Sequence, residues 1–261
     1  MTEEYSLLIG GERVAAPDGY EVINPSTEKV VGMAPNASVE QAAAACSAAR
    51  DAFDSWSRTP MGERCAILDR IADVLDAHRD ELVPLVQAET GATMRVAKTM
   101  QVPQAAARFR RYAQVETNLV PLPPAVMPTT ALAPGGIIGG VEHRAPVGVV
   151  AAIAAYNFPV TNMAGQIAPA PAMGNTVVVK PPTQDPLGVI RMVELFEEAG
   201  LPPGVVNTVS ANTVEAAEAI TGSPDVDMIS FTGSTGVGCR IAEVGGRQMK
   251  RLLLELGGKG A

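Results

Sequence analysis

The residues best suited to chemistry lie in one stretch near the end of the sequence, residues 226–258. Within it, the apolar run 226–231 predicts a buried strand, and a glycine-rich turn, 232–238, follows directly. Ser234 in this turn can cap the helix that begins there. Glycines let an anion come close to the backbone, and the first N–H groups of a helix point at whatever lies above them. The turn therefore predicts a phosphate site, although alone it also fits a plain strand-to-helix turn.

A carboxylate follows one strand later. Residues 252–256 are interpreted as another buried strand that is apolar except for Glu255. Burying an ionised carboxylate is costly unless it is paired with a cation or takes part in chemistry. Glu255 is therefore a candidate general base, and the alternative is a paired structural carboxylate.

The elements that must position these residues form a regular alternation from Pro146 onward. We predict short apolar strands over 147–154, 176–179, 205–209, 226–231 and 251–256, separated by helices over 159–173, 186–200, 214–221 and 236–244. This pattern is typical of an α/β, doubly wound, mostly parallel sheet with helices on both faces. Ligands bind such sheets beyond the carboxyl ends of the strands. Asn157, Lys180 and Ser234 each follow a predicted strand, so we expect them at one edge, with Glu255 nearby.

The N-terminal part predicts hairpins and helices. Short strands are expected over 6–9 and 13–15 as one pair and over 20–23 and 29–33 as a second pair. Helices are expected from the capping box at Ser38 to Trp56, from Pro60 onward, over 81–89 and over 93–116. Pro84 and Pro103 should kink or bound their helices. Residues 120–140 are rich in proline and glycine, which indicates a linker or strands outside the main sheet. Residues 135–141 fit an edge strand for a subunit contact, or equally an ordinary surface loop.

Composition limits the function classes. The 261 residues are 47% hydrophobic, enough for a sizeable core, and carry a net charge of −8. This charge argues against nucleic acid and anionic membranes as partners, since both need a basic face. Three scattered cysteines predict a reducing compartment and no structural metal site. No apolar run approaches membrane-spanning length, and the acidic start is unlike a signal peptide, so a cytoplasmic protein is expected.

Four motifs, read in order, resemble one family. Residues 156–159 (YNFP), 174–181 (GNTVVVKP), 231–235 (FTGST) and 254–259 (LELGGK) resemble the NAD(P)-dependent aldehyde dehydrogenase superfamily in sequence, order and spacing. The resemblance covers the whole chain and implies a Rossmann-like fold of the aldehyde dehydrogenase type. It implies oxidation of an aldehyde to a carboxylic acid with NAD(P)+, through a cysteine thioester that activated water hydrolyses. It also divides the chain into N-terminal hairpins and helices (1–119), oligomerisation strands or linker (120–145) and a dinucleotide-binding core (146–261).

The resemblance also assigns roles. Asn157 would donate its amide to the oxyanion, unless it is only a turn residue before a helix, and Glu255 would activate the water. Lys180 would bind the adenosine ribose, and the helix at Ser234 would hold the pyrophosphate. The full set expected at the cofactor is Ile153, Ala154, Ala155, Tyr156, Lys180, Thr183, Gly233, Ser234, Val237, Gly238, Leu256 and Gly257. Phe158, Thr161 and Asn162 would face the aldehyde, and their mixed character favours a neutral aromatic or aliphatic substrate.

The chain departs from the family pattern at several points. Thr183 stands where NAD-preferring members often have glutamate, which predicts that NADP is accepted or preferred over NAD. Gln166 replaces a common lysine, so that lysine's proposed proton relay is not carried over.

The family's nucleophile is also missing. The family cysteine lies a few dozen residues beyond the Glu255 motif, and Cys46, Cys65 and Cys239 stand in no nucleophile motif. We therefore expect the cofactor-binding half of an enzyme that forms a homo-dimer or homo-tetramer at full length, with this chain alone inactive. The alternatives are a dinucleotide-binding module without turnover and a structural or interaction fragment.

Overall fold

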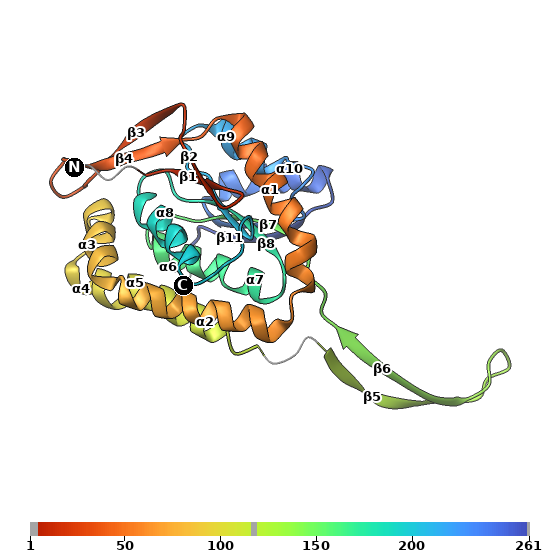
Figure 1. Ribbon diagram of the computed structural model, residues 1–261. Helices are drawn as coiled ribbons and strands as arrows, with labels where there is room; N and C mark the ends of the chain where they lie inside the picture. The colour runs from red at the N-terminus through yellow and green to blue at the C-terminus, as the bar shows by residue number, and fades with distance from the viewer. Residues whose placement is uncertain (1–4, 116–118, 260–261) are drawn as a thin grey trace.

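The computed structural model describes residues 5–115 and 119–259. Its centre is a seven-stranded sheet in the order β11-β10-β7-β8-β9-β1-β2 (Figure 1). These strands are β1 (Leu7–Ile9), β2 (Glu12–Val14), β7 (Val149–Ile153), β8 (Thr176–Lys180), β9 (Val206–Thr208), β10 (Met228–Gly233) and β11 (Arg251–Leu256). Strands β7 to β11 pair in parallel, whereas β1 pairs antiparallel with both β9 and β2. The predicted mostly parallel sheet is confirmed, and the N-terminal hairpin extends it.

Side chains alternate between the two faces of the central strands, and each face has its own core. Val150 and Ala152 pack with α2 (Met61–Ala77), α3 (Arg79–Thr90), α5 (Val102–Tyr112), α6 (Pro159–Ile167) and α8 (Leu187–Glu194). Val149 and Ala151 pack on the other face with α1 (Val39–Arg58), α9 (Val214–Thr221) and α10 (Thr235–Arg247). Burial on both faces explains why β7 is apolar throughout and why β8 is apolar between Thr176 and Lys180. Within the described residues, no helix is long and apolar enough to cross a bilayer.

Two predicted helices are interrupted. The expected helix 93–116 becomes α4 (Met94–Val96), a π-helical turn η1 (Ala97–Gln101) and α5, while its predicted end at Glu116 lies outside the described residues. Pro103, in the first turn of α5, has no N–H to continue the ladder, which places the break just before it. The expected helix 186–200 likewise ends as a 3₁₀ turn, η2 (Leu195–Glu197), and residues 159–173 divide into α6 and α7 (Pro169–Ala172). The capping box at Ser38 is confirmed.

The interpretation of residues 252–256 as a buried strand is wrong. Within residues 5–115 and 119–259, strand β11 is the end strand of the sheet and pairs with β10 alone, and its residues are exposed or half-buried. Because α10 covers one of its faces and its second edge has no neighbouring strand in that part of the chain, the apolar run does not become a core strand. Glu255 is exposed rather than buried among apolar side chains. The cost of burying a carboxylate therefore gives no reason to regard it as a general base, and the case for that role rests on its position alone.

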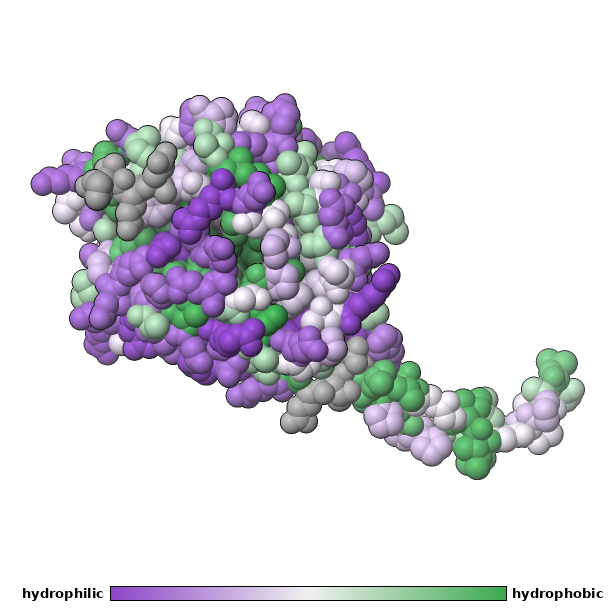
Figure 2. Space-filling view, in the orientation of Figure 1, coloured by the Kyte–Doolittle hydropathy of each residue, from purple (hydrophilic) through white to green (hydrophobic). Residues whose placement is uncertain are grey.

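Residues on either side of 130 form a separate two-stranded arm. Strands β5 (Leu119–Met127) and β6 (Gly136–His143) pair antiparallel outside the main sheet and extend away from the body (Figure 1). The prediction of strands outside the main sheet is confirmed. The arm carries apolar side chains in solvent (Figure 2), including Leu122, Val126, Ile137, Ile138 and Val141. A second small sheet, β3 (Asp18–Ile23) with β4 (Val30–Asn36), precedes α1.

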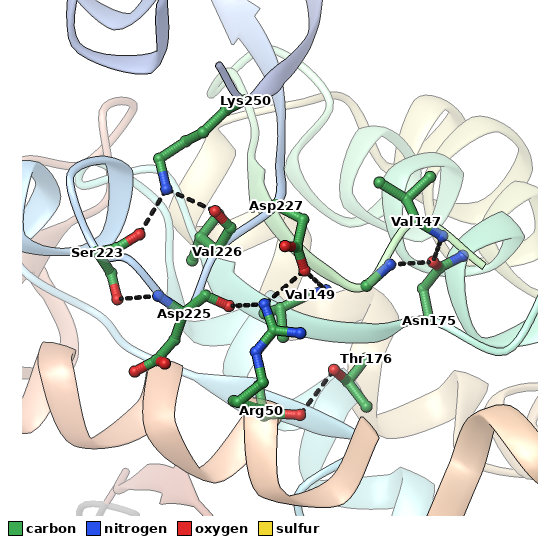
Figure 3. A network of polar contacts seen from close by, with 12 residues as sticks. Arg50, Val147, Val149, Asn175, Thr176, Ser223, Asp225, Val226, Asp227 and Lys250 are labelled. Atoms are coloured by element: carbon green, nitrogen blue, oxygen red, sulfur yellow. Dashed lines mark hydrogen bonds and ion pairs between the residues drawn. The ribbon is translucent and has the colours of Figure 1, made fainter. Parts of the chain in front are cut away.

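The amino ends of the parallel strands are fastened by buried Asn175 and half-buried Asp227 (Figure 3). Asn175 Oδ1 accepts hydrogen bonds from Val147 N at 2.6 Å and from the next N–H at 3.0 Å. Asp227 Oδ2 accepts from Val149 N at 2.7 Å and from the Arg50 guanidinium at 2.6 Å. Each side chain therefore joins two elements and fixes the register at which β7 and its neighbours begin.

Candidate functional site

The opposite edge of the sheet is hollowed into a groove. It has a volume of about 1080 Å³ and follows the carboxyl ends of β7, β8, β10 and β11, with α9 and α10 as further walls. That is the edge at which parallel sheets of this kind bind ligands. The volume is at the upper end of the range for small-molecule sites, so it suits a long ligand.

The N-terminus of α10 opens into this groove. Ser234 is the N-cap, with extended backbone and a side chain that accepts a hydrogen bond from Val237 N at 3.4 Å. At Gly236 an added Cβ would meet no atom within 4 Å, so this turn is open on its outer side. At Gly238 an added Cβ would lie 2.4 Å from Leu256, so glycine there lets α10 pack closely on β11. The first turn of α10 therefore lies at the groove, and the phosphate site there stays a prediction.

Lys180 is a buried cation at the end of β8. Only 8% of the residue is exposed, and its Nζ donates to Pro181 O at 3.1 Å and to Thr183 Oγ1 at 3.2 Å. The Thr183 hydroxyl in turn donates to Ala211 O at 3.3 Å. Burial lowers the pKa of Lys180 to about 8, since both of its partners are neutral. The ammonium therefore lines the groove without a carboxylate among these partners.

Asn157 follows β7 at the mouth of the groove. Its Oδ1 accepts hydrogen bonds from Phe158 N at 3.0 Å and from Asn162 Nδ2 at 3.1 Å. Because the backbone N–H can only donate, the oxygen must face it, and the Nδ2 end of Asn157 is turned away from these two donors. Asn157 is exposed, so its N–H groups can donate to a ligand in the groove.

Glu255 and Thr232 lie side by side across β11 and β10. The parallel register pairs the two residues directly, and both line the groove. Thr235 Oγ1 donates to Gly257 O at 3.3 Å, which ties the start of α10 to the chain just after Glu255. An exposed carboxylate and a helix N-terminus thus share the same wall.

Most of the sequence-predicted residues come together here. The groove is lined by these members of the predicted set: Ile153, Ala154, Ala155, Tyr156, Asn157, Asn162, Lys180, Thr183, Gly233, Ser234, Val237, Glu255, Leu256 and Gly257. Phe158, Thr161 and Gly238 are not in the lining. Thr161 is buried, and its hydroxyl donates to the carbonyls of Met100 and Gln101 at 2.6 and 2.9 Å. Successive residues of an α-helix are rotated by about 100° about its axis. Asn162 therefore faces the groove, whereas Thr161, one residue earlier, lies against η1.

Sequence reasoning missed the wall between α9 and α10. Its residues are Val214, Ala217, Glu218 and Thr221 from α9 and Arg240, Ile241 and Val244 from α10. Within each helix these residues recur three or four positions apart, as residues on one helix face do. This spacing is the feature of the sequence from which the wall could have been predicted. Arg240 Nε and Glu218 Oε1 lie 3.0 Å apart and connect the two helices.

None of the three cysteines is in the lining of the groove. Cys46 and Cys65 are buried free thiols, and burial raises the pKa of both, to about 11 for Cys46. Cys239 is exposed on α10, outside the groove lining. A thiol must ionise to attack a carbonyl, and burial disfavours the thiolate form of both Cys46 and Cys65, so neither environment favours a nucleophile.

Comparisons with known proteins identify the family. A protein-family model described as the aldehyde dehydrogenase family matches residues 14–261. The chain belongs to the aldehyde dehydrogenase family. Its relatives include a phenylacetaldehyde dehydrogenase from Pseudomonas fluorescens, 39% identical over 98% of this chain and 51% of the relative. Another family relative, a 2-aminomuconic semialdehyde dehydrogenase from Bos taurus, is 36% identical over 97% of this chain and 50% of its own length.

Solved aldehyde dehydrogenase structures share the fold. An NAD+ complex of an aldehyde dehydrogenase from Bacillus cereus is similar with a TM-score of 0.87 and 34% identity, over 99% of this chain and 52% of that one. AldC from Pseudomonas syringae, a C291A mutant with NAD+ and octanal, also has a TM-score of 0.87, at 33% identity over 98% of this chain and 51% of its own. This family chain therefore spans about half the length of the curated relatives it matches.

Proposed function

We propose that this chain supplies the dinucleotide site, the oxyanion donor and the general base of an NAD(P)-dependent aldehyde dehydrogenase. The observation that carries the proposal is the convergence of Asn157, Lys180, Ser234 and Glu255 on one groove. A purely structural fragment needs neither an outward amide donor nor a carboxylate at a ligand-binding edge. NAD+ complexes of family neighbours support the cofactor class.

The groove fits a dinucleotide in size and in chemistry. Its volume of about 1080 Å³ accommodates an elongated ligand, the start of α10 offers N–H donors to the pyrophosphate, and Lys180 can donate to ribose hydroxyls. Ala154 and Ala155 present small side chains after β7, so the ligand can approach the backbone there. Bound there, the dinucleotide would supply the hydride acceptor for oxidation of the aldehyde.

Two side chains of this chain would act on the substrate. Asn157 donates a hydrogen bond through Nδ2 to the oxygen that gains negative charge when the aldehyde is attacked. Removing one such donor typically costs ~3–4 kcal/mol of transition-state stabilisation. Glu255, exposed beside Thr232, accepts a proton from the water that hydrolyses the acyl intermediate, so a free acid is released.

The attacking thiol is not among the groove-lining residues. We therefore expect the isolated chain to bind a dinucleotide without oxidising aldehydes. The substrate we propose for the complete enzyme is a neutral aromatic or aliphatic aldehyde, because Tyr156, Asn157 and Asn162 provide a mixed, uncharged mouth. The name of the phenylacetaldehyde dehydrogenase relative is in keeping with that class.

We further propose that NADP+ is accepted at least as well as NAD+. Lys180 has only neutral partners, and Thr183 places a hydroxyl rather than a carboxylate beside it. A 2′-phosphate beside Thr183 would meet the Lys180 ammonium, whose hydrogen-bond partners Pro181 O and Thr183 Oγ1 are neutral. Thr183→Glu should lower NADP+ affinity about tenfold or more while changing NAD+ affinity little. Thr183→Gln is the neutral control of similar size.

The arm formed by β5 and β6 is our proposed contact between subunits of a homo-dimer or homo-tetramer. It exposes apolar side chains on both strands, and an unpaired strand edge can pair with another chain. A double change, Ile137→Lys with Val141→Lys, should shift any oligomer to monomer in sedimentation experiments. Unchanged mass would remove the arm from this role.

Calorimetric titration of the purified, folded chain with NADP+ and NAD+ tests the proposed function. We expect saturable binding of both and no aldehyde-dependent NAD(P)H formation. Lys180→Met should abolish or strongly weaken binding, whereas Arg79→Met, at a solvent-exposed ion pair on α3, should not. A folded chain that binds neither dinucleotide would sink the proposal.

A further inference from the structure

A second, smaller cavity lies on the β9–β1–β2 side of the central sheet. It has a volume of about 240 Å³ and is lined by the β1–β2 hairpin, by strand β9, by the end of α8 with η2, and by the loop that follows η2. Its walls are largely apolar, and they include Leu8, Val193, Phe196, Leu201 and Val206. The residues that line it and those that line the groove are different sets, so the two cavities are distinct.

Glu194, the last residue of α8, brings a buried carboxylate to this cavity. Its side chain is 6% exposed, and its Oε2 accepts a hydrogen bond from Arg191 Nη1 at 3.2 Å. Its Oε1 is buried and accepts no hydrogen bond from the described residues. Arg13 Nη1 lies 3.9 Å from Oε1, which is beyond hydrogen-bond distance. A buried carboxylate oxygen without a donor is costly, so Oε1 is placed to accept a hydrogen bond that the chain does not supply.

The charges around the cavity favour a cation over an anion. Two carboxylates, those of Glu194 and Glu197, belong to the lining, and Arg13 is the cationic side chain in it. The neighbouring Arg191 pairs with Glu81 as well as with Glu194, so its charge is already shared. The Arg13 side chain is 53% exposed and makes only the long contact with Glu194, so an incoming cation can displace it at little cost.

The cavity is formed before any ligand binds. Gly10 N donates to Asn207 Oδ1 at 2.8 Å, which fastens the hairpin turn to β9. At Gly11, where φ is +87°, an added Cβ would lie 2.6 Å from Pro203, so glycine lets the turn pack against the loop after η2. Because these walls are already fixed, a ligand would not have to order them.

We propose that this cavity binds a small organic cation, an ammonium or amidinium group on a compact apolar body. The charged group donates to Glu194 Oε1, and the apolar body packs against Phe196 and Leu201. A volume of about 240 Å³ is below the range of drug-sized sites, which limits the body to one ring or a short branched chain. This inference is independent of the proposed function, since it uses no residue of the groove.

An NMR titration of the purified chain with benzamidine tests the proposal. We expect saturable shifts of backbone amide signals at residues 8–13 and 193–206, which surround the cavity, and none at groove residues 232–234. Benzamide and benzoate carry the same ring with a neutral and an anionic group. Both should bind about tenfold more weakly or less, because neither offers a charge-assisted hydrogen bond to a carboxylate.

Three variants assign the binding to Glu194. Glu194→Gln keeps the size of the side chain and removes its charge, so it should weaken benzamidine binding about tenfold. Glu215→Gln, in the exposed first turn of α9 and outside both linings, is the matched control and should leave the affinity unchanged. Arg13→Ala removes the cation that competes for Glu194 and should raise the affinity a few-fold.

The results that overturn the proposal are equally specific. They are a folded wild-type chain without saturable shifts, shifts confined to the groove, benzoate binding as tightly as benzamidine, or equal binding by Glu194→Gln. If Glu194→Gln does not fold, the comparison of benzamidine with benzamide and benzoate on the wild-type chain decides. Loss of dinucleotide binding in the same samples would contradict the proposed function and leave this cavity unaffected.

Discussion

Two lysines at opposite ends of the same sheet are equally buried but differently surrounded. Lys180 and Lys250 each leave 8% of their surface exposed. At the amino end, Lys250 Nζ donates to the carbonyls of Ser223 and Val226 (Figure 3), and the nearby Asp227 favours its charge. Burial still lowers the pKa of Lys250, but the negative charge of Asp227 offsets part of that effect.

At the carboxyl end, the hydrogen-bond partners of the Lys180 ammonium among the described residues are Pro181 O and the Thr183 hydroxyl, and burial lowers its pKa to about 8. The chain completes the polar network at one end and leaves a cation without a counter-charge at the other. Binding sites commonly keep such destabilised groups where a ligand will complete them. The comparison predicts that the two ends respond in opposite ways to substitution.

The largest effect is expected from Asn175→Ala at the amino end. This change removes two hydrogen bonds to backbone N–H groups and a third from Nδ2 to Ala170 O at 3.0 Å. Leaving buried N–H groups unpaired should reduce the free energy of unfolding by about 3 kcal/mol. Urea denaturation measures the loss, and dinucleotide affinity below the transition should be unchanged. Asn24→Ala, in an exposed turn, is the control and should cost far less.

Lys180→Met should have the opposite sign for stability. Since burial disfavours the charged form, removing the ammonium should raise the free energy of unfolding by about 2 kcal/mol at pH 7, while dinucleotide binding is lost.

The folded pKa of Lys180, about 8, is below that of the unfolded chain. Above pH 8 the unfolded state therefore binds more protons, and wild-type stability from this group rises with pH until the unfolded lysine also deprotonates. The advantage of Lys180→Met should accordingly shrink between pH 8 and about pH 10.4. A constant advantage across this range would contradict the assignment.

Lys250→Met is the matched change at the other end. It leaves the carbonyls of Ser223 and Val226 without their donor, so the free energy of unfolding should fall by about 1.5 kcal/mol. Dinucleotide binding should stay within a factor of two. Thermal denaturation measures the stability of the Lys180 and Lys250 variants, and calorimetry measures their dinucleotide affinity. The contrast between the two ends of the sheet is contradicted if both substitutions change stability in the same direction.

The smallest effect separates the helix cap from the anion site. Ser234→Ala should reduce stability by about 1 kcal/mol and weaken dinucleotide binding a few-fold. Ser234→Asp keeps a capping carboxylate and therefore stability, but its charge should repel a pyrophosphate and lower affinity about tenfold. Equal binding by the Ala and Asp variants would show that no phosphate lies at this helix end.

The sequence predicted the carboxyl edge better than the amino edge. Strand ends, glycine turns and caps are local signals, so Lys180 and Ser234 could be placed before any tertiary structure was known. The hydrogen bond by which Asp227 fastens the start of β7 could not be predicted, because it joins residues 78 positions apart in the sequence. The side of α6 on which Thr161 lies depends on a rotation of one residue along the helix, which the sequence pattern did not resolve. The exposure of β11 depends on the order of strands in the sheet, and hydrophobic periodicity does not predict that order.

Hydrogen–deuterium exchange with and without NADP+ tests most directly where the chain binds its ligand. We expect slower exchange at residues 232–234, 236–237 and 212–214, which line the groove, and no change at residues 147–149 and 223–227 of the amino end. Protection that appears at the amino end instead, or nowhere in a chain that calorimetry shows to be saturated, would contradict the assignment of the groove.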